Sequence, residues 1–147
     1  MSRRSTLELG SPVVVFCMVL TLVGCSDPSR NHVPGVYTGS FTSGPSTGEP
    51  VVVVVGETDI TRAGLTVRIY TGSSFSRITF DSTGSWPLTW NERDSVYDYS
   101  MSLAANDRSV SIEGVVGIDT DKKPTVHGSV TVDTSESAGK FYLYLEE

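Results

Sequence analysis

The chain has 147 residues, of which 38% are hydrophobic and 19% charged, and its formal net charge is −6. That length suits one domain rather than two. The low charged fraction argues against a helical bundle or coiled coil, whereas abundant Val, Thr, Ser, Gly and Tyr is typical of strands and turns. An acidic chain offers no basic patch for phosphates, so we expect no nucleic-acid partner.

The N-terminus has the pattern of a secretory signal. Arg3 and Arg4 precede an apolar run over residues 13–23. A transmembrane helix needs about 17 to 25 apolar residues, and Gly24 ends this run after eleven. We therefore interpret residues 1–24 as a signal peptide that is removed from the mature protein.

The end of this segment resembles the lipobox of bacterial lipoproteins. Its four positions are Leu22, Val23, Gly24 and Cys25. In that family a peptidase cuts between the small residue and the cysteine, here between Gly24 and Cys25. The cysteine thiol carries diacylglycerol, and the new amine takes a fatty acyl chain such as palmitate. The resemblance thus implies lipid attachment at Cys25, and two or three acyl chains anchor a protein stably to a membrane.

The residue that follows the lipobox cysteine indicates in which bacterial membrane the protein is anchored. An Asp directly after the cysteine would resemble an inner-membrane retention signal, but Ser26 stands there and Asp27 comes one place later. The outer membrane of the bacterial cell envelope is therefore favoured. Cys17 leaves with the signal and Cys25 carries lipid, so no thiol remains for a disulfide. The mature chain keeps nine basic and sixteen acidic residues, a net charge of −7.

The mature chain divides into a tether and a β domain. Residues 25–34 are polar, contain two prolines and include His32, and they read as a flexible tether. Residues 35–147 show eight short apolar or alternating runs, separated by Gly, Pro, Asn, Asp and Ser. The runs are 35–43, 51–55, 65–71, 77–81, 95–103, 109–117, 125–133 and 140–146.

Alternation within these runs predicts one apolar and one polar face for each strand. We expect an all-β fold, a single up-and-down antiparallel β-barrel of about eight strands, because closure removes exposed strand edges. A two-sheet β-sandwich is the alternative. The side chains expected to face inward are Tyr37, Phe41, Leu65, Val67, Ile69, Ile78, Phe80, Tyr97, Tyr99, Met101, Leu103, Val110, Ile112, Phe141, Leu143 and Leu145.

The first and last runs, residues 35–41 and 138–143, resemble the terminal strands of small lipocalin- or avidin-like eight-stranded barrels of envelope lipoproteins. The resemblance implies a barrel that could carry a small apolar ligand. A barrel of eight strands is either filled by its own side chains or holds one small ligand. The bulky inward set favours a filled interior.

No constellation of residues indicates catalysis. His127 alternates outward on its strand, between Thr125 and Ser129, and reads as a solvent-facing side chain. No nucleophile elbow or phosphate-binding glycine loop occurs, and Asp119 and Asp121 begin a calcium-loop pattern that the following residues do not complete. We expect no enzyme activity, no metal and no cofactor.

The segment 85–94 is the longest expected connection and carries both tryptophans, Trp86 and Trp90. Two exposed aromatic rings could stack on sugars or anchor a protein partner. Alternatively, both rings cover one end of the barrel as a plug. The flanking Glu92, Arg93 and Asp94 complete this candidate recognition loop.

Together these patterns predict a lipid-anchored envelope lipoprotein with a non-enzymatic binding or protein-interaction role. The mature charge of −7 suits a cationic envelope protein, because complementary fields accelerate association. Small lipid-anchored barrels that inhibit lysozyme-like hydrolases are one version of such a protein, but their cysteine motifs are absent here. The alternative function is carriage of a small apolar ligand.

Overall fold

The computed structural model describes residues 32–147, which form nine antiparallel strands and no helix. The signal peptide, Cys25 and most of the tether predicted above lie outside the described residues. No helix able to cross a membrane is found within residues 32–147. The strands are β1 (Gly35–Ser43), β2 (Pro50–Val55), β3 (Asp59–Thr71), β4 (Ser74–Pro87), β5 (Thr89–Asn91), β6 (Val96–Ala105), β7 (Arg108–Ile118), β8 (Pro124–Val132) and β9 (Glu136–Leu145).

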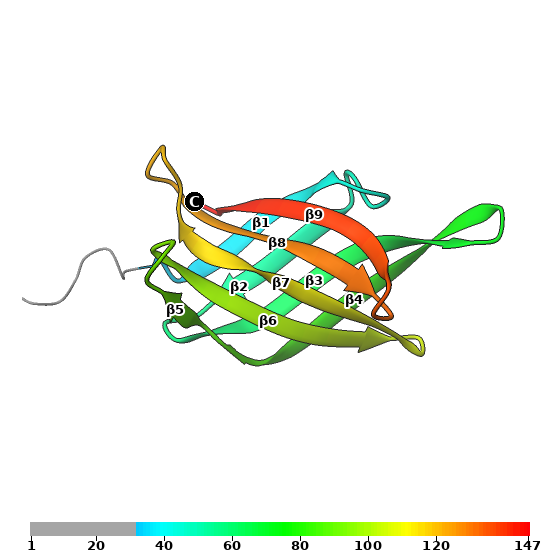
Figure 1. Ribbon diagram of the computed structural model, residues 1–147, viewed down its shortest axis with the longest axis horizontal. Helices are drawn as coiled ribbons and strands as arrows, with labels where there is room; N and C mark the ends of the chain where they lie inside the picture. Colours follow the sequence, from blue (N-terminus) through cyan, green and yellow to red (C-terminus); the bar gives the residue numbers. More distant parts are fainter. Residues whose placement is uncertain (1–31) are drawn as a thin grey trace, which may run out of the picture. The chain divides into compact units, whose positions relative to one another are not determined.

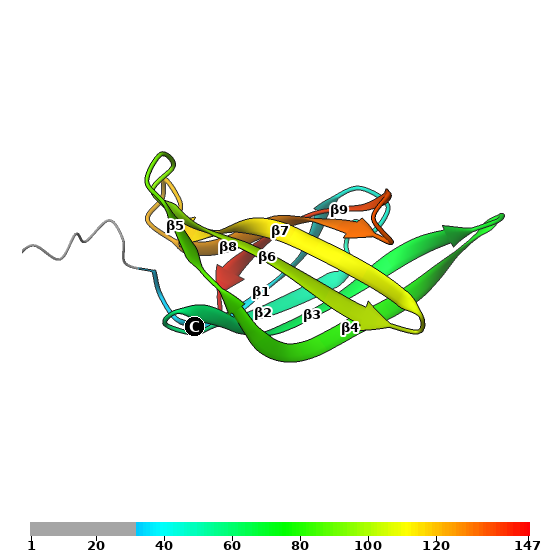
Figure 2. The same cartoon turned by 60° about the horizontal axis from the view of Figure 1, so that its bottom comes forward.

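All nine strands belong to one strongly curled sheet, in the order β4-β3-β2-β1-β9-β8-β7-β6-β5 (Figures 1 and 2). Strands adjacent in the chain pair as hairpins, except β4 and β5, and β1 also pairs with β9. At the sheet's outer ends, only Leu88 separates β4 from β5, and β4 also lies against β6. The prediction of an all-β antiparallel meander is therefore confirmed, with one barrel-like sheet rather than two separate sheets.

The strand count is nine rather than eight because the segment expected as a long connection is mostly strand. Trp86 and Pro87 extend β4 by pairing with β3, while Trp90 lies in β5 and pairs with β6. Proline is tolerated at the end of a strand, where its missing N–H removes little of the ladder. β3 also starts earlier than expected, since a bulge between Ile60 and Arg62 interrupts the alternation that marks a strand in sequence.

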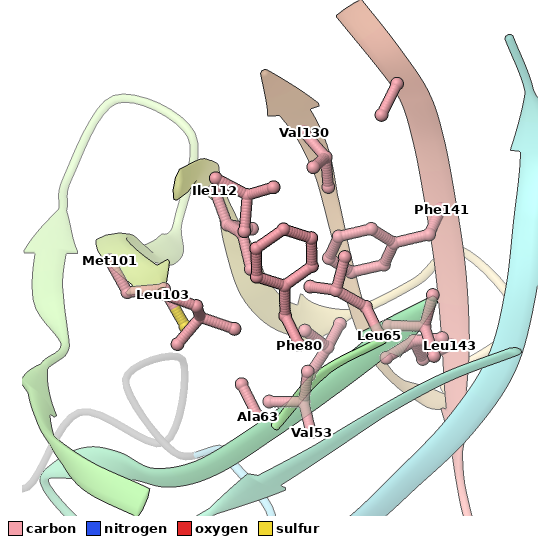
Figure 3. Close-up of a cluster of buried hydrophobic side chains, with 14 of the residues drawn as sticks. Val53, Ala63, Leu65, Phe80, Met101, Leu103, Ile112, Val130, Phe141 and Leu143 are labelled. Atoms are coloured by element: carbon pink, nitrogen blue, oxygen red, sulfur yellow. The ribbon is translucent and has the colours of Figure 1, made fainter. Parts of the chain in front are cut away.

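The concave face of the sheet holds the core, as alternation predicts. Thirteen of the sixteen side chains expected to face inward are buried, and the other three, Ile78, Tyr97 and Leu145, are partly buried against them. Phe80 and Phe141 point into this interior from different strands (Figure 3). The Phe41 and Phe141 rings meet edge to face at 6.0 Å. A disulfide-free domain thus relies on aromatic and aliphatic burial for its stability.

The meander gives the domain two ends. The turns at residues 56–58, 92–95 and 119–123 share one end with the C-terminus, and we call it the entry end because residue 32 also lies there (Figure 1). A ring nitrogen of His32 donates to the Gly56 carbonyl at 2.8 Å, and the His32 ring meets Tyr97 edge-on at 4.9 Å. Packing against the domain therefore begins three residues before Gly35, within the segment expected as tether.

Candidate functional site

Acidic side chains gather at the entry end, on its turns, at the first residue of β3 and at the chain terminus. We call this set, with its basic neighbours, the acidic rim. Its acidic members are Glu57, Asp59, Glu92, Asp94, Asp119, Asp121, Glu146 and Glu147, and its basic members are Arg93, Lys122 and Lys123. The rim carries a net charge of −5, whereas all other residues in 32–147 together carry −2. The field of the domain is therefore concentrated at one end.

Side-chain hydrogen bonds shape two of the turns of the acidic rim. The Oδ1 atom of Asp119 accepts from the backbone N–H groups of Asp121 and Lys123, both at 2.9 Å. Asn91 accepts from the N–H groups of Arg93 and Asp94 at 3.1 and 3.3 Å. Such side-chain-to-backbone bonds are the reason Asp and Asn favour turns. They stabilise the backbone of the two turns on which Asp94 and Asp121 are exposed.

The predicted recognition residues separate into two groups. Trp86, from β4, is half-buried against the core. Trp90, from β5, is half-buried and meets the Tyr97 ring at 5.1 Å. Glu92, Arg93 and Asp94 are exposed in the β5–β6 turn. The structure therefore places Trp90 beside the charged turn, while Trp86 contributes to the core and the two rings form no shared exposed platform.

A second feature lies at the opposite end, where the β3–β4 hairpin projects beyond the other loops (Figure 1, in green). We call residues 66–79 the arm. At its tip Tyr70 faces Phe75 across the hairpin, their ring centroids 5.3 Å apart. The two residues are 58% and 57% exposed. The two neighbouring rings therefore form an exposed apolar surface at the tip of the arm.

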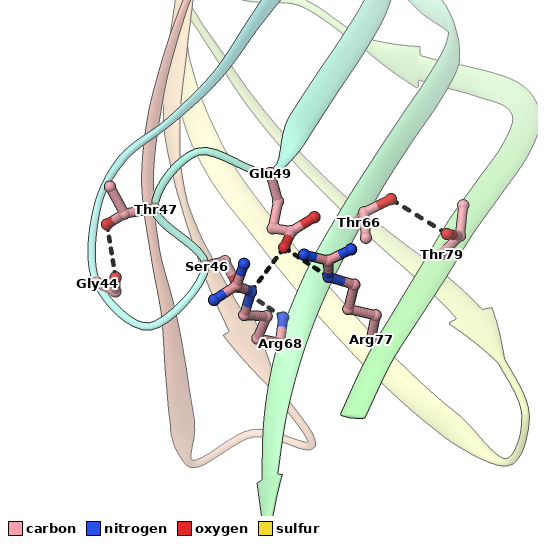
Figure 4. A network of polar contacts seen from close by, with 8 residues as sticks. All are labelled: Gly44, Ser46, Thr47, Glu49, Thr66, Arg68, Arg77 and Thr79. Carbon is pink, nitrogen blue, oxygen red and sulfur yellow. Dashed lines mark hydrogen bonds and ion pairs between the residues drawn. The ribbon is translucent and has the colours of Figure 1, made fainter. Parts of the chain in front are cut away.

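Behind the tip, Arg68 and Arg77 lie directly opposite each other, an arrangement that like charges make unfavourable. The carboxylate of Glu49, only 7% exposed, resolves the conflict (Figure 4). Its Oε1 atom accepts from Nε of Arg68 at 2.6 Å and lies 3.0 Å from Nε of Arg77. Ser46 also fixes this strand, because its hydroxyl oxygen accepts from the Arg68 backbone N–H at 2.8 Å.

A third feature is a recess across the outer face of the sheet, which we call the cross-strand groove. Two hollows, of about 560 and 320 Å³, share Glu113 and Gly114 as lining residues. The register places two parallel rows of outward side chains along it. One row is Thr89, Asp98, Val115, His127 and Tyr142, and the other is Ser100, Glu113, Ser129 and Lys140.

The groove is bounded below by a row of inward-facing residues that includes Gly114 and Gly128. Beneath these glycines the Tyr99 hydroxyl donates to the His127 carbonyl at 3.3 Å, and burial raises the pKa of this phenol above its ordinary value. On the outer side the His127 and Tyr142 rings stack nearly parallel, 5.1 Å apart. His127 is exposed as predicted, yet partial desolvation lowers its pKa below the ordinary histidine value.

Neither the groove nor the Glu49 contacts were anticipated from sequence, because both depend on strand register. Among residues 32–147, no three His, Cys, Asp or Glu side chains gather closely enough to hold a metal ion. No family model, curated protein or solved structure matches the chain. Geometry and charge are thus the basis on which the function is proposed.

Proposed function

We propose that this chain is a lipid-anchored bacterial envelope lipoprotein that binds a cationic protein partner, without catalysis, through the acidic rim. The observation that carries the proposal is the concentration of charge at one end, with −5 on the rim and −2 on the remaining residues of 32–147. Complementary fields steer association and select partners. The rim includes Glu92, Arg93 and Asp94, the charged part of the recognition segment predicted from sequence.

The anchor in this proposal is Cys25, the last residue of the lipobox pattern. His32 already packs on the domain, so the tether that remains is residues 25–31, which could span at most about 25 Å. The acidic rim lies at the end of the domain where the described chain begins. A tether of that reach would still leave room for a partner to bind the rim. The outer membrane is the proposed site, since Ser26 rather than Asp follows the cysteine.

The scaffold in this proposal is a closed eight-stranded barrel in which β4 and β5 act as one long strand, bent at Leu88. Three observations support it: β4 pairs with β3, β5 pairs with β6, and β4 lies against β6. Closure would leave no free edge for unwanted strand pairing. Because the interior is lined by core side chains such as Phe80 and Phe141, binding is proposed on the outside rather than for an apolar ligand within.

The partner proposal is tested by capture of envelope proteins on the purified lipidated protein, at low and moderate salt. We expect captured cationic protein to decrease as salt rises, since screening weakens exposed charge interactions. The variant Asp94→Asn with Asp121→Asn, both in exposed turns of the rim, should capture less. The matched control is Asp107→Asn with Glu136→Gln, the same charge change at the opposite end.

Two outcomes would contradict the partner proposal. One is capture that does not respond to salt. The other is an equal loss of capture in the rim variant and the control variant, because that would show a dependence on total charge rather than on the rim. The control variant should keep the capture of the unmodified protein at both salt concentrations.

A further inference from the structure

We propose that the cross-strand groove is a binding site for a linear, hydroxyl-rich oligosaccharide. The groove lies on the outer face of β5 to β9 and reaches Thr42 of β1. Six adjacent strands with five spacings of about 4.8 Å give it a length of roughly 24 Å. Its larger hollow, about 560 Å³, lies within the roughly 300–1,000 Å³ typical of ligand sites.

The side chains that line the groove supply the two kinds of contact a sugar chain needs. Tyr142, stacked on His127, offers an aromatic surface to the apolar face of a pyranose ring. The carboxylates of Glu113 and Asp98 and the hydroxyls of Ser100 and Ser129 line the groove or its edge. Carboxylate oxygens accept hydrogen bonds only, so they pair with sugar hydroxyls, which donate.

The backbone beneath the groove argues for a glycan over an extended peptide. A peptide that adds to a sheet needs a free strand edge for main-chain hydrogen bonds. Here β7, β8 and β9 are each paired on both sides by antiparallel ladders. Recognition in the groove therefore falls to outward side chains. Apart from Val115, the outward side chains of the two rows are polar or aromatic, whereas peptide side chains are held mainly in apolar pockets.

The lowered pKa of His127 is consistent with this site. A neutral imidazole has one donor and one acceptor nitrogen, which suits hydroxyl groups that both donate and accept. The inference does not depend on lipid at Cys25 or on the acidic rim. If no tetrasaccharide binds the groove, the proposed binding of a cationic partner by the acidic rim is unaffected. If no cationic partner is captured, the proposal of a glycan site in the groove is likewise unaffected.

The test is calorimetric titration of the purified full chain, in a zwitterionic detergent, with four linear β-linked tetrasaccharides. The probes are built from glucose, N-acetylglucosamine, mannose and xylose. We expect at least one to bind with saturation, and Tyr142→Ala and Glu113→Gln each to weaken it at least about tenfold. Tyr142→Phe, which keeps the ring, should retain binding. The urea unfolding midpoint of Tyr142→Ala, measured separately, shows whether that variant is folded when its binding is lost.

The control for nonspecific aromatic contact is Tyr70→Ala, which removes an exposed ring from the arm, outside the groove. Its affinity should equal that of the unmodified protein. Absence of saturable binding by all four tetrasaccharides would overturn the inference. Tetrasaccharide binding that is unchanged in Tyr142→Ala and Glu113→Gln would also overturn it. A third contradicting result is saturable binding of an extended lysine-rich peptide by a protein that binds none of the tetrasaccharides.

Discussion

Gly114 of β7 and Gly128 of β8 lie directly opposite each other above the Tyr99 hydroxyl. A Cβ atom on Gly114 would lie 2.0 Å from the His127 carbonyl oxygen and 2.6 Å from the Tyr99 hydroxyl oxygen. A Cβ atom on Gly128 would meet the same hydroxyl at 2.7 Å. Close packing, rather than an unusual backbone angle, therefore requires glycine at both positions and lets the Tyr99 ring fill the space beneath the groove.

Replacement of Gly114 by alanine should destabilise the domain by about 3 kcal/mol, because the new methyl group collides with backbone that cannot move aside. The measurement is the urea midpoint of unfolding. Gly64→Ala is the matched control, since the nearest atom to its added Cβ is 3.7 Å away. The control should change stability by no more than about 0.5 kcal/mol. Equal midpoints for the two variants would contradict the packing argument.

Glu49→Gln should cost about 2 kcal/mol of stability, because it removes the buried negative charge between Arg68 and Arg77. The same change made in an Arg77→Gln background should cost clearly less, since one of the two facing cations is then absent. Unfolding of all four combinations gives the coupling directly. A cost of Glu49→Gln that is identical in both backgrounds would show that the carboxylate does not act through Arg77.

Stability at high pH should depend on Tyr37. Burial raises the pKa of this phenol to about 12, and its hydroxyl donates to the Val33 carbonyl at 2.5 Å. The unfolded phenol loses its proton near its ordinary pKa of 10.0, so stability should fall as pH rises from 10 to 12. In Tyr37→Phe the free energy of unfolding should decrease less steeply over this interval. An unchanged slope would show that Tyr37 ionises as readily when folded.

His127 should titrate below its ordinary pKa of 6.5 in the folded protein, because partial desolvation disfavours the imidazolium. The unfolded chain then binds a proton first as pH falls, so this residue's contribution to stability is lost below pH 6.5. NMR titration of the ring protons measures the midpoint. Tyr142→Ala, which removes the stacked ring, should raise it. A midpoint above 6.5 in the unmodified protein would contradict the assignment.

Much of the core could be read from alternation alone. Leu65, Val67 and Ile69 are buried as predicted, because a half-buried strand in a regular ladder keeps a strict period of two. The prediction was less accurate where the ladder is irregular. Ile60 and Ala63 are fully buried core residues, yet the bulge near Ile60 and Arg62 hides the period that would mark them as strand.

Turn-forming residues misled the prediction around β4. Residues 82–85, Ser, Thr, Gly and Ser, are turn-forming types that follow the predicted run 77–81, yet they lie within this strand. Long-range pairing with β3 outweighs their local preference, as the ladder from Asp59–Pro87 to Thr71–Ser74 shows. The groove and the Glu49 contacts could not be foreseen at all, since each joins residues whose proximity depends on the register between strands.

The central claim is that the β domain is anchored to the membrane by lipid on Cys25. It is tested most directly by measuring the mass of the mature protein extracted from bacterial envelope membranes. We predict a chain that begins at Cys25 and carries diacylglycerol on sulfur and an acyl chain on its amine. The Cys25→Ala chain should lack both additions and remain uncut before position 25. An envelope-extracted protein with an unmodified Cys25 thiol, or with an N-terminus at another residue, would contradict the account.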